Sequence, residues 1–468
     1  MKMNTNKGGD NFNWDELLER IESGNIIPVI GQGLYWIDVD GKERLLYDYL
    51  AERLAESNGF TLPPGANHKF SKAAFRFLEK QKEKEVSDFV AAKHLRNSLL
   101  EMLKPLKLID ANPLWKLARV RAFTLFLNTT YDDFLVNTIR RARSYPTSAR
   151  YYTLKDKDIH DLGDEFFNSP RHPKRTLVYN LYGNVRERVD SAFTEKDILE
   201  TIVKFQKDME VNRANRLFLE LEGNSLLFIG CGYEDWLFRF FVRTICNRPF
   251  QYQKELAACK FIGDDFGDEE TASANELVRF LKSYGAEIFY SGGGRNFVKL
   301  LFDKLEHHFP GEIIPVSEFP ATAFICFHGA NRPAAVELTR GLKAGGVNVW
   351  LDEREFEPGD EIDETIINAI ERCPVFVPLI SEETKTLFLE NGKMKYHYQE
   401  WNWVYLFNKK YGNKAKTIIP VIVDGTDWMY EKFKDFFYLK VPGGKTGEKD
   451  FEKLRKKIEA EQRNWAAE

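Results

Sequence analysis

The sequence contains few cysteines and no long hydrophobic run, and each shortage excludes a class of protein. Its 468 residues include five cysteines, which are scattered and form no Cys-x-x-Cys pair. This pattern argues against a zinc ribbon or a disulfide framework and favours a reduced, cytoplasmic chain. No apolar run approaches the ~20 residues that cross a bilayer. The first residues also lack the apolar centre of a secretory signal, so we expect no membrane association.

Metal-ligand spacing and an excess of charge are also missing. The eight histidines are dispersed, so we expect no metal site and no metal cofactor. Lysine and arginine total 67 and aspartate and glutamate total 71, which leaves a formal net charge of −4. A chain with so small a net charge has no long-range electrostatic field that would steer nucleic acid onto it, so we expect no direct nucleic-acid binding.

Hydrophobic residues, by contrast, are abundant. They make up 43% of the chain and aromatic residues 14%, which suffices for large cores and is atypical of a disordered chain. At this length two or three domains are expected. Helical patterns such as 44–58 and 72–103 alternate with short apolar runs, which predicts an α/β fold with a mainly parallel sheet. The runs that predict buried strands are 25–30, 123–127, 176–182, 225–230, 260–263 and 287–291.

A proline-rich break separates this region from a second, shorter one. The stretch HFPGEIIPVSEFP holds three prolines and a glycine and favours an extended linker, which we place at 309–318. After it, the runs TAFICF, VNVWL, VFVPLI and TIIPVIV are strand-like, with helical segments between them. The sequence therefore predicts two α/β domains, over 14–308 and 319–465.

The second region carries its motifs in a distinctive order. A first strand, AFICF, is followed by a strand ending in Trp350-Leu351-Asp352, by a Pro358-Gly359-Asp360 turn, and by a helix and a further strand that ends at Ser381. A plain turn with a helix cap would explain the Pro-Gly-Asp sequence equally well. The order and spacing resemble the TIR family over nearly all of 319–465. The resemblance implies a flavodoxin-like fold and a loop that rearranges over the substrate and touches a neighbouring TIR domain.

A glutamate lies in an otherwise aromatic helical stretch, KYHYQEWNWVYLF. Helical spacing places Tyr396, Glu400, Trp403 and Phe407 on one face. A carboxylate on such a face is costly to bury unless it is paired or used in chemistry. Because Trp401 makes the neighbouring face aromatic as well, a Glu400 that points into solvent is the alternative. The TIR resemblance implies that Glu400 is the catalytic glutamate of an NAD⁺ glycohydrolase.

A single glutamate suits the cleavage of NAD⁺. The nicotinamide is already a cationic leaving group, so the main barrier is the positive charge that develops on the ribose, and a fixed carboxylate stabilises that charge. NAD⁺ is then the substrate, and no cofactor is expected. Phe327, Trp350 and Asp352 lie at predicted strand ends, where open α/β sheets bind ligands, and we predict that they contact the nucleotide. For Trp350, a place in the core is the alternative.

A glycine-rich loop follows the first predicted strand. Its sequence is Ile30-Gly31-Gln32-Gly33. Two glycines at this position let the backbone approach a phosphate. A tight turn between a strand and a helix would also select glycines, so the loop alone leaves both interpretations open.

The segments LNTTYD and YNLYG, together with this loop, resemble the SIR2-like domains of bacterial defence proteins. The resemblance implies a Rossmann-like parallel sheet and a nucleotide site that includes Thr130, Asp132 and Tyr182. Thr130 stands where the family has its catalytic asparagine, unless a shift of one residue recruits Asn128, and Tyr182 stands where it has its histidine. A tyrosine with a pKa of about 10 keeps its proton at neutral pH, whereas a histidine of about 6.5 can accept one. We therefore expect this domain to keep its fold and to lose the hydrolysis, which leaves three roles open: a nucleotide sensor that binds NAD⁺ or ADP-ribose, an oligomerisation scaffold or a docking surface.

These features predict a SIR2-like–TIR fusion in which the TIR domain hydrolyses NAD⁺ on activation or oligomerisation. By resemblance, the setting is antiphage defence through NAD⁺ depletion, with self-association through TIR domains and a sensor or trigger partner. Two alternatives stay open: a non-catalytic assembly scaffold or nucleotide sensor, and a SIR2-like domain that is itself the NADase. The substitutions at Thr130 and Tyr182 argue against the last alternative.

Overall fold

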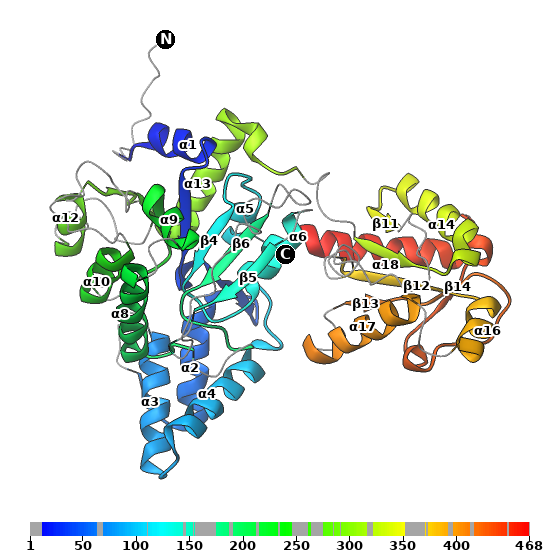
Figure 1. Ribbon diagram of the computed structural model, residues 1–468, viewed down its shortest axis with the longest axis horizontal. Coiled ribbons are helices and arrows are strands. Elements are labelled where there is room, and N and C mark those ends of the chain that lie inside the picture. Colours follow the sequence, from blue (N-terminus) through cyan, green and yellow to red (C-terminus); the bar gives the residue numbers. More distant parts are fainter. Residues whose placement is uncertain are drawn as a thin grey trace. The chain divides into compact units, whose positions relative to one another are not determined.

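The structure, a computed structural model, consists of two compact units, Met1–Pro315 and Val316–Glu468 (Figure 1). Each unit is described by itself. The residues that the structure describes are 12–62, 69–109, 111–143, 147–152, 154, 175–186, 191–211, 215–232, 235–245, 261–263, 275–283, 285–290, 292–315, 322–351, 370, 373–391, 396–411, 416–446 and 449–467.

A parallel sheet forms the centre of the first unit. Its strands are β1 (Ile26–Ile30), β4 (Leu125–Asn128), β5 (Thr147–Tyr151), β6 (Thr176–Asn180), β7 (Ser225–Ile229), β8 (Phe261–Gly263) and β9 (Glu287–Ile288). Among the described residues these seven strands have the order β5-β6-β4-β1-β7-β8-β9, and each neighbouring pair is parallel. Every residue of β1, β4, β6 and β7 is buried, as is typical of strands covered on both faces. The predicted parallel α/β sheet is confirmed.

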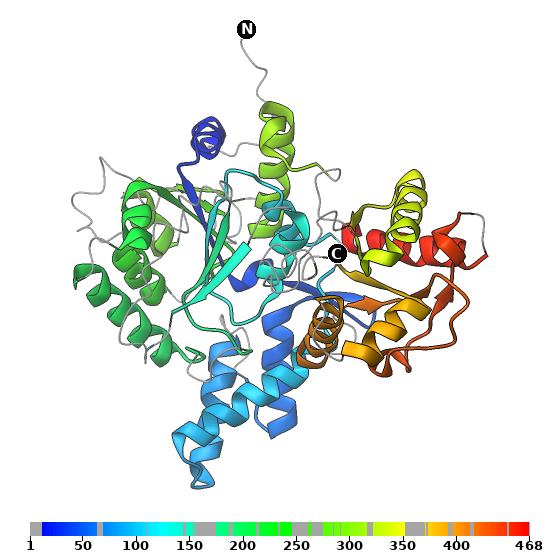
Figure 2. The ribbon, with the colours of Figure 1, turned by 45° about the vertical axis from the view of Figure 1, so that its right-hand side comes forward.

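Helices cover this sheet and also form a separate group. They are α1 (Trp14–Glu22), α2 (Leu46–Asn58), α3 (Lys69–Glu83), α4 (Asp88–Leu103), α5 (Pro113–Ala118), α6 (Phe134–Ala142), α8 (Glu195–Val211), α9 (Arg216–Gly223), α10 (Asp235–Ile245), α12 (Glu276–Ser283) and α13 (Gly293–His308). Figures 1 and 2 show α2, α3 and α4 together at one end of the unit. The single helix predicted over 72–103 is two helices, because the chain turns at Glu85, whose φ of 59° is left-handed.

Some strands of the first unit carry no apolar run. An antiparallel hairpin of β2 (Trp36–Val39) and β3 (Lys42–Leu45) follows the glycine-rich loop, so the helix predicted from residue 44 begins two residues later, at α2. Strand β5 has the polar sequence TSARY and is only partly buried. Both departures arise because hydrophobic patterning detects buried strands and passes over exposed ones.

The segment after α13 packs onto the first unit. Ile313 and Ile314 are 5% and 1% exposed. Ile313 forms a bridge with Val120, and the Ile314 amide donates to the Arg119 carbonyl at 2.8 Å. The first half of the predicted linker 309–318 is therefore part of the core, because its isoleucines bury apolar surface there. The boundary between the two units still falls inside the predicted segment.

The second unit contains a smaller parallel sheet. Its strands are β10 (Ala323–Cys326), β11 (Val349–Leu351), β12 (Val375–Ile380), β13 (Thr417–Ile418), β14 (Val421–Ile422) and β15 (Leu439–Lys440). Among the described residues the order is β11-β10-β12-β14-β15, with β13 also paired to β12, and the pairs are parallel. The second strand of the domain, β11, lies on one side of the first, β10, and the later strands lie on the other side. This is the flavodoxin-like strand order, so the predicted fold is confirmed.

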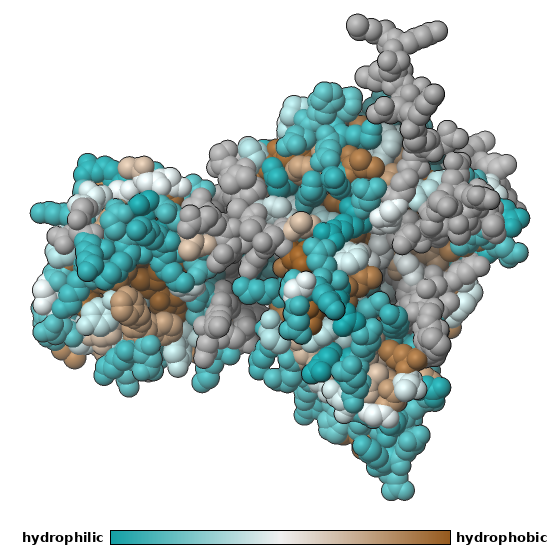
Figure 3. Space-filling view, turned by 180° about the vertical axis from the view of Figure 1, so that it is seen from behind, coloured by the Kyte–Doolittle hydropathy of each residue, from teal (hydrophilic) through white to brown (hydrophobic). Residues whose placement is uncertain are grey.

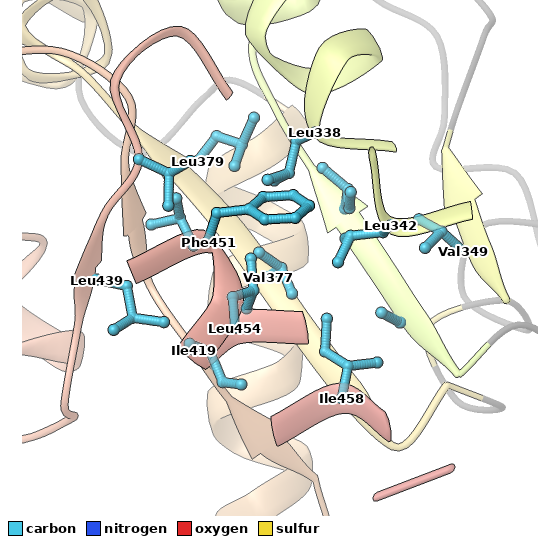
Figure 4. Packing of buried hydrophobic residues seen from close by; sticks show 14 of the residues in the cluster. Leu338, Leu342, Val349, Val377, Leu379, Ile419, Leu439, Phe451, Leu454 and Ile458 are labelled. Atoms are coloured by element: carbon cyan, nitrogen blue, oxygen red, sulfur yellow. The ribbon is translucent and has the colours of Figure 1, made fainter. Parts of the chain in front are cut away.

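Each face of this sheet has its own hydrophobic core. The helices of the unit are α14 (Arg332–Ala344), α16 (Glu382–Asn391), α17 (Tyr396–Tyr411) and α18 (Lys449–Ala467). On one face Leu338 and Leu342 of α14 and Phe451 and Leu454 of α18 meet strand side chains such as Val377 (Figure 4). The opposite face packs against α17. None of the helices that the structure describes combines the length and the apolar character needed to span a bilayer.

Candidate functional site

Helix α17 buries one face against the sheet, and Glu400 belongs to that face. Glu400 is 8% exposed, Trp401 and Val404 are fully buried, and Asn408 is 4% exposed. These positions recur at helical spacing and therefore lie on one side of the helix. The alternative of a Glu400 that points into solvent does not agree with this burial.

The buried face differs from the one that spacing predicted. Trp403 and Phe407 are half-buried, and their rings stack with centres 5.1 Å apart. Trp401, which the sequence placed on the neighbouring side, is in the core instead. The side chain of Tyr396 lies outside the described residues. A helix that is aromatic nearly all round offers no hydrophobic stripe from which to choose its buried side.

Trp401, in the first half of α17, is bonded to the carboxyl end of the sheet. Its indole Nε1–H donates to the Sγ of Cys326 at 3.1 Å, and Cys326 is the last residue of β10. The indole also contacts the rings of Tyr430 and Phe433, with centres 5.2 and 5.4 Å away. Because Glu400 directly precedes Trp401, it lies near the edge at which open α/β sheets bind ligands.

The structure describes two of the three predicted nucleotide contacts, and these two lie on opposite faces of the sheet. Trp350 is half-buried on the α17 side of the sheet and stacks on Phe324, with ring centres 4.6 Å apart. Phe327 packs against the core on the opposite face, because side chains alternate along a strand. Asp352 lies outside the residues that the structure describes, as does the loop that follows it. Of these three residues, Trp350 is the one that the structure places on the same face as Glu400.

The surroundings of α17 strengthen electrostatic interactions. The core on this face is rich in aromatic rings, including Phe324, Trp401, Tyr430 and Phe433. In such a setting the effective dielectric is low, so a carboxylate stabilises a nearby positive charge more strongly than it does in water. Among the described residues, no group of three or more histidine, cysteine, aspartate and glutamate side chains is placed to hold a metal ion.

A cavity of about 710 Å³ lies elsewhere in the same unit. It is lined by the first residues of α14, the end of β14 and the segment after β15. Two acidic side chains border it, and both have partners: Glu337 pairs with Arg340, and Asp424 accepts from the Glu382 amide at 2.7 Å. No described residue of α17 lines this cavity, so it does not contribute to a site around Glu400.

In the first unit, Gly31 and Gly33 allow two loops to pack closely. Their amides donate to the carbonyls of Ile229 and Gly230, at 3.0 and 2.8 Å. A Cβ on Gly31 would lie 2.2 Å from the Gly230 oxygen, and one on Gly33 would lie 3.1 Å from the Gly230 Cα. The contact between the loops after β1 and β7 therefore accounts for both glycines. Nucleotide binding by this loop, with Gln32 between the glycines, stays a prediction.

A buried polar cluster occupies the carboxyl ends of β4 and β6. The Nδ2 of Asn128 donates to the Oδ1 of Asn180 at 2.7 Å. The Oδ1 of Asn128 accepts from the Tyr35 hydroxyl at 3.2 Å, and the Thr130 hydroxyl lies 3.0 Å from both groups. All four side chains have no exposed surface, and burial raises the pKa of Tyr35. Asn128 and Thr130 thus belong to one hydrogen-bonded cluster.

Asp132 is held by donors from the protein itself. Its Oδ2 accepts from the Tyr47 hydroxyl at 2.5 Å, and its Oδ1 accepts from the Phe134 amide at 2.8 Å. The Tyr47 hydroxyl in turn accepts from the Tyr131 amide at 2.9 Å. Burial raises the pKa of Asp132 to about 6, although these hydrogen bonds oppose the shift. The carboxylate therefore links two helices and a loop of the fold.

Tyr182 is buried against α8 and α10. It is 2% exposed, and its ring lies 6.4 Å from that of Phe241. With Phe205 and other residues of α8 and α10 it lines a space of about 10 Å³, which could hold no more than about one water molecule. The Tyr182 side chain and its neighbours therefore leave almost no empty space around the ring.

Comparisons with known proteins assign a family to each unit. Residues 124–288 match the family model of the SIR2-like domain, and residues 323–455 match that of the TIR domain. The chain carries a SIR2-like domain followed by a TIR domain.

A solved structure also matches part of this chain. It is the TIR domain of the Toll-related receptor TRR-2 from Hydra magnipapillata, with 18% sequence identity and a TM-score of 0.22. The alignment covers 31% of this chain and 99% of that chain. Among curated proteins, none matches this chain.

Several residues around these sites were missed by sequence reasoning. In the SIR2-like domain, Asn180 ends its strand as Asn128 ends the neighbouring one, and the two are register partners. A polar residue at the end of an apolar strand is the sequence feature that would have indicated Asn180. Tyr35 and Tyr47 offer no such signal in a chain with 19 tyrosines. In the TIR domain, nothing in the sequence marks Cys326 as a partner of the α17 indole.

Proposed function

We propose that the TIR domain cleaves the bond between nicotinamide and ribose in NAD⁺, with Glu400 as the catalytic residue. Both domain families of the chain are linked to NAD⁺ processing. The observation that carries the proposal is the position of Glu400, an 8% exposed acidic residue beside an indole that is anchored to the end of β10. Acidic side chains are seldom buried in folded proteins, so a buried glutamate near this edge of the sheet is a candidate for function.

The proposed role of Glu400 is electrostatic. As the nicotinamide leaves, positive charge develops on the ribose, and the carboxylate stabilises it while accepting hydrogen bonds from ribose hydroxyls. The aromatic surroundings of α17 exclude water and strengthen this interaction. Trp350, on the same face of the sheet, is the proposed aromatic contact for the nucleotide.

The first test is NAD⁺ consumption by full-length protein with Glu400→Gln, which keeps the side-chain size and removes the charge. We expect the rate to fall at least ~100-fold, because the stabilising charge is lost. A matched control is the swap Gln399→Glu/Glu400→Gln, which keeps the net charge but moves the carboxylate to an exposed position. The swap should be as inactive as the single variant. Wild-type turnover by Glu400→Gln would contradict the assignment.

We further propose that activity depends on self-association of TIR domains. Figure 3 shows hydrophobic areas on the surface of this domain, and its exposed large side chains support association. These are Leu389, Leu406, Phe437 and Tyr438, which are 70%, 51%, 76% and 44% exposed. The rate per molecule should therefore rise with protein concentration or with a trigger. A species shown by light scattering to be monomeric, yet fully active, would contradict this part of the proposal.

The SIR2-like domain has a different proposed role. Thr130 lies within a hydrogen-bonded cluster and Tyr182 is buried beside a space of only about 10 Å³, which supports a domain that does not hydrolyse NAD⁺. We propose that it regulates assembly, as a nucleotide sensor or as the docking site of a trigger partner. In the proposed setting, antiphage defence, the activated TIR domain stops an infected cell by depleting its NAD⁺.

A further inference from the structure

We propose that the hydrogen bond between Trp401 and Cys326 positions the carboxylate of Glu400 for the reaction. On this view Trp401 and Cys326 are positioning residues, and the inference rests on the proposed function of Glu400. The Nε1–H of the indole donates to the Sγ of Cys326 at 3.1 Å. The indole has no exposed surface and the thiol is 2% exposed, so water does not compete for either group.

The acceptor belongs to a rigid part of the domain. Cys326 ends β10, a central strand that pairs with β11 on one side and with β12 on the other. Its register partner on β12 is Pro378. The sulfur therefore has a fixed position at the carboxyl end of the sheet, where a ligand of this fold is expected to bind.

The indole N–H of Trp401 links the orientation of α17 to this fixed sulfur. The indole is held by the rings of Tyr430 and Phe433, whose centres lie 5.2 and 5.4 Å away. These ring contacts restrain the depth of the indole, whereas the directional N–H bond restrains its rotation. Glu400 is the preceding residue, about 100° away around the helix axis. A rotation of α17 that breaks the N–H bond therefore also displaces the Glu400 carboxylate.

Such a displacement affects chemistry more than binding. A misplacement of about 1 Å at a reacting centre lowers rates ~100-fold, and partial loss of orientation should lower them less. Most contacts to a dinucleotide would be made away from the carboxylate and would be retained. Loss of the N–H bond should therefore lower kcat and leave KM nearly unchanged.

The test compares the removal of two thiols from the same hydrophobic core. Cys326→Ala removes the acceptor, and Cys373→Ala is the matched control, because Cys373 is also 2% exposed and belongs to the same cluster. In full-length, assembled protein, Cys326→Ala should lower kcat about tenfold, with KM within about twofold of the wild type. Cys373→Ala should leave both constants within about twofold, although both variants lose a similar amount of buried volume. Cys326→Ser, whose hydroxyl can still accept the N–H, should recover part of kcat.

Trp401→Phe is a second variant that keeps an aromatic ring in the core and removes the donor. It should reproduce the loss of kcat, and it tests the proposal if Cys326→Ala does not fold. Equal losses of kcat in Cys326→Ala and Cys373→Ala, or unchanged kcat in both Cys326→Ala and Trp401→Phe, would overturn the positioning role. Wild-type turnover by Glu400→Gln would instead overturn the proposed function itself.

Discussion

The two domains place buried acidic residues at the carboxyl ends of their sheets in different ways. In the SIR2-like domain Asp132 is itself the anchor, because its two oxygens accept from the Tyr47 hydroxyl and the Phe134 amide. In the TIR domain the residue next to the acid is an anchor. Trp401 bonds to the end of β10, and Glu400 is the residue beside it.

This difference shows that burial alone does not identify a catalytic carboxylate. A carboxylate that holds elements of the fold together contributes to stability, and its removal should be seen in unfolding experiments. A carboxylate that is positioned by another residue can serve chemistry, and its removal should be seen in the rate. The comparison therefore predicts stability effects in the SIR2-like domain and activity effects in the TIR domain.

The largest expected effect concerns the glycine-rich loop of the SIR2-like domain. Gly31→Ala would place a Cβ 2.2 Å from the Gly230 carbonyl oxygen. Backbone cannot yield as a flexible side chain does, so we expect a loss of more than ~3 kcal/mol in the free energy of unfolding. Urea unfolding followed by circular dichroism measures this loss.

Gly311→Ala is the control for this substitution, because no atom lies within 4 Å of the added Cβ. It should leave the free energy of unfolding within about 0.5 kcal/mol of the wild type. Equal stability of the two variants would show that the close approach of the two loops is not what requires glycine.

The next effect is a pH dependence of stability at Asp132. Burial raises the pKa of its carboxyl in the folded chain to about 6, above the value of about 3.9 expected in the unfolded chain. The folded state therefore holds the proton more tightly, and stability from this group falls as pH rises through the window between those values. Asp132→Asn removes the titration.

Urea unfolding at pH 4.5 and at pH 7.5 measures this effect. Between these two values the wild type should lose about 2 kcal/mol relative to the Asp132→Asn protein. Because the two proteins are compared at the same pH, the contributions of all other titrating groups to the free energy of unfolding cancel. A difference between the two proteins that does not change with pH would contradict a raised pKa at Asp132.

The fold could be predicted from the sequence wherever burial leaves a regular pattern. β1, β7 and β12 are continuous apolar runs covered on both faces, and each was predicted to within a residue or so. β5, with the polar sequence TSARY, left no such pattern. The turn at Glu85 was also missed, because a left-handed residue within a helical pattern depends on how the two helices pack.

The candidate sites were less predictable because they depend on contacts between distant segments. The two glycines of the first loop are required by Gly230, about two hundred positions away in the chain. The place of Trp401 in the core depends on Cys326, and no local pattern distinguishes it from Trp403 on an aromatic helix. Sequence patterns indicate residue types that suit a function, whereas the fold decides which side chains meet.

The smallest effect is expected at Tyr182. Tyr182→Phe removes the hydroxyl and keeps the buried ring. If the SIR2-like domain performs no chemistry, NAD⁺ consumption by assembled protein should stay within about twofold of the wild type. A tenfold or greater fall in the rate of NAD⁺ consumption, at unchanged oligomeric state, would indicate that the SIR2-like domain is the NADase.

Release of nicotinamide by assembled full-length protein tests the central claim most directly, because it reports cleavage of the bond between nicotinamide and ribose. The wild type, Glu400→Gln and the double variant Thr130→Val/Tyr182→Phe should be compared at one protein concentration. We predict that Glu400→Gln releases nicotinamide at least ~100-fold more slowly, while the double variant stays within about twofold. Nicotinamide release that survives Glu400→Gln and disappears in the double variant would contradict the account.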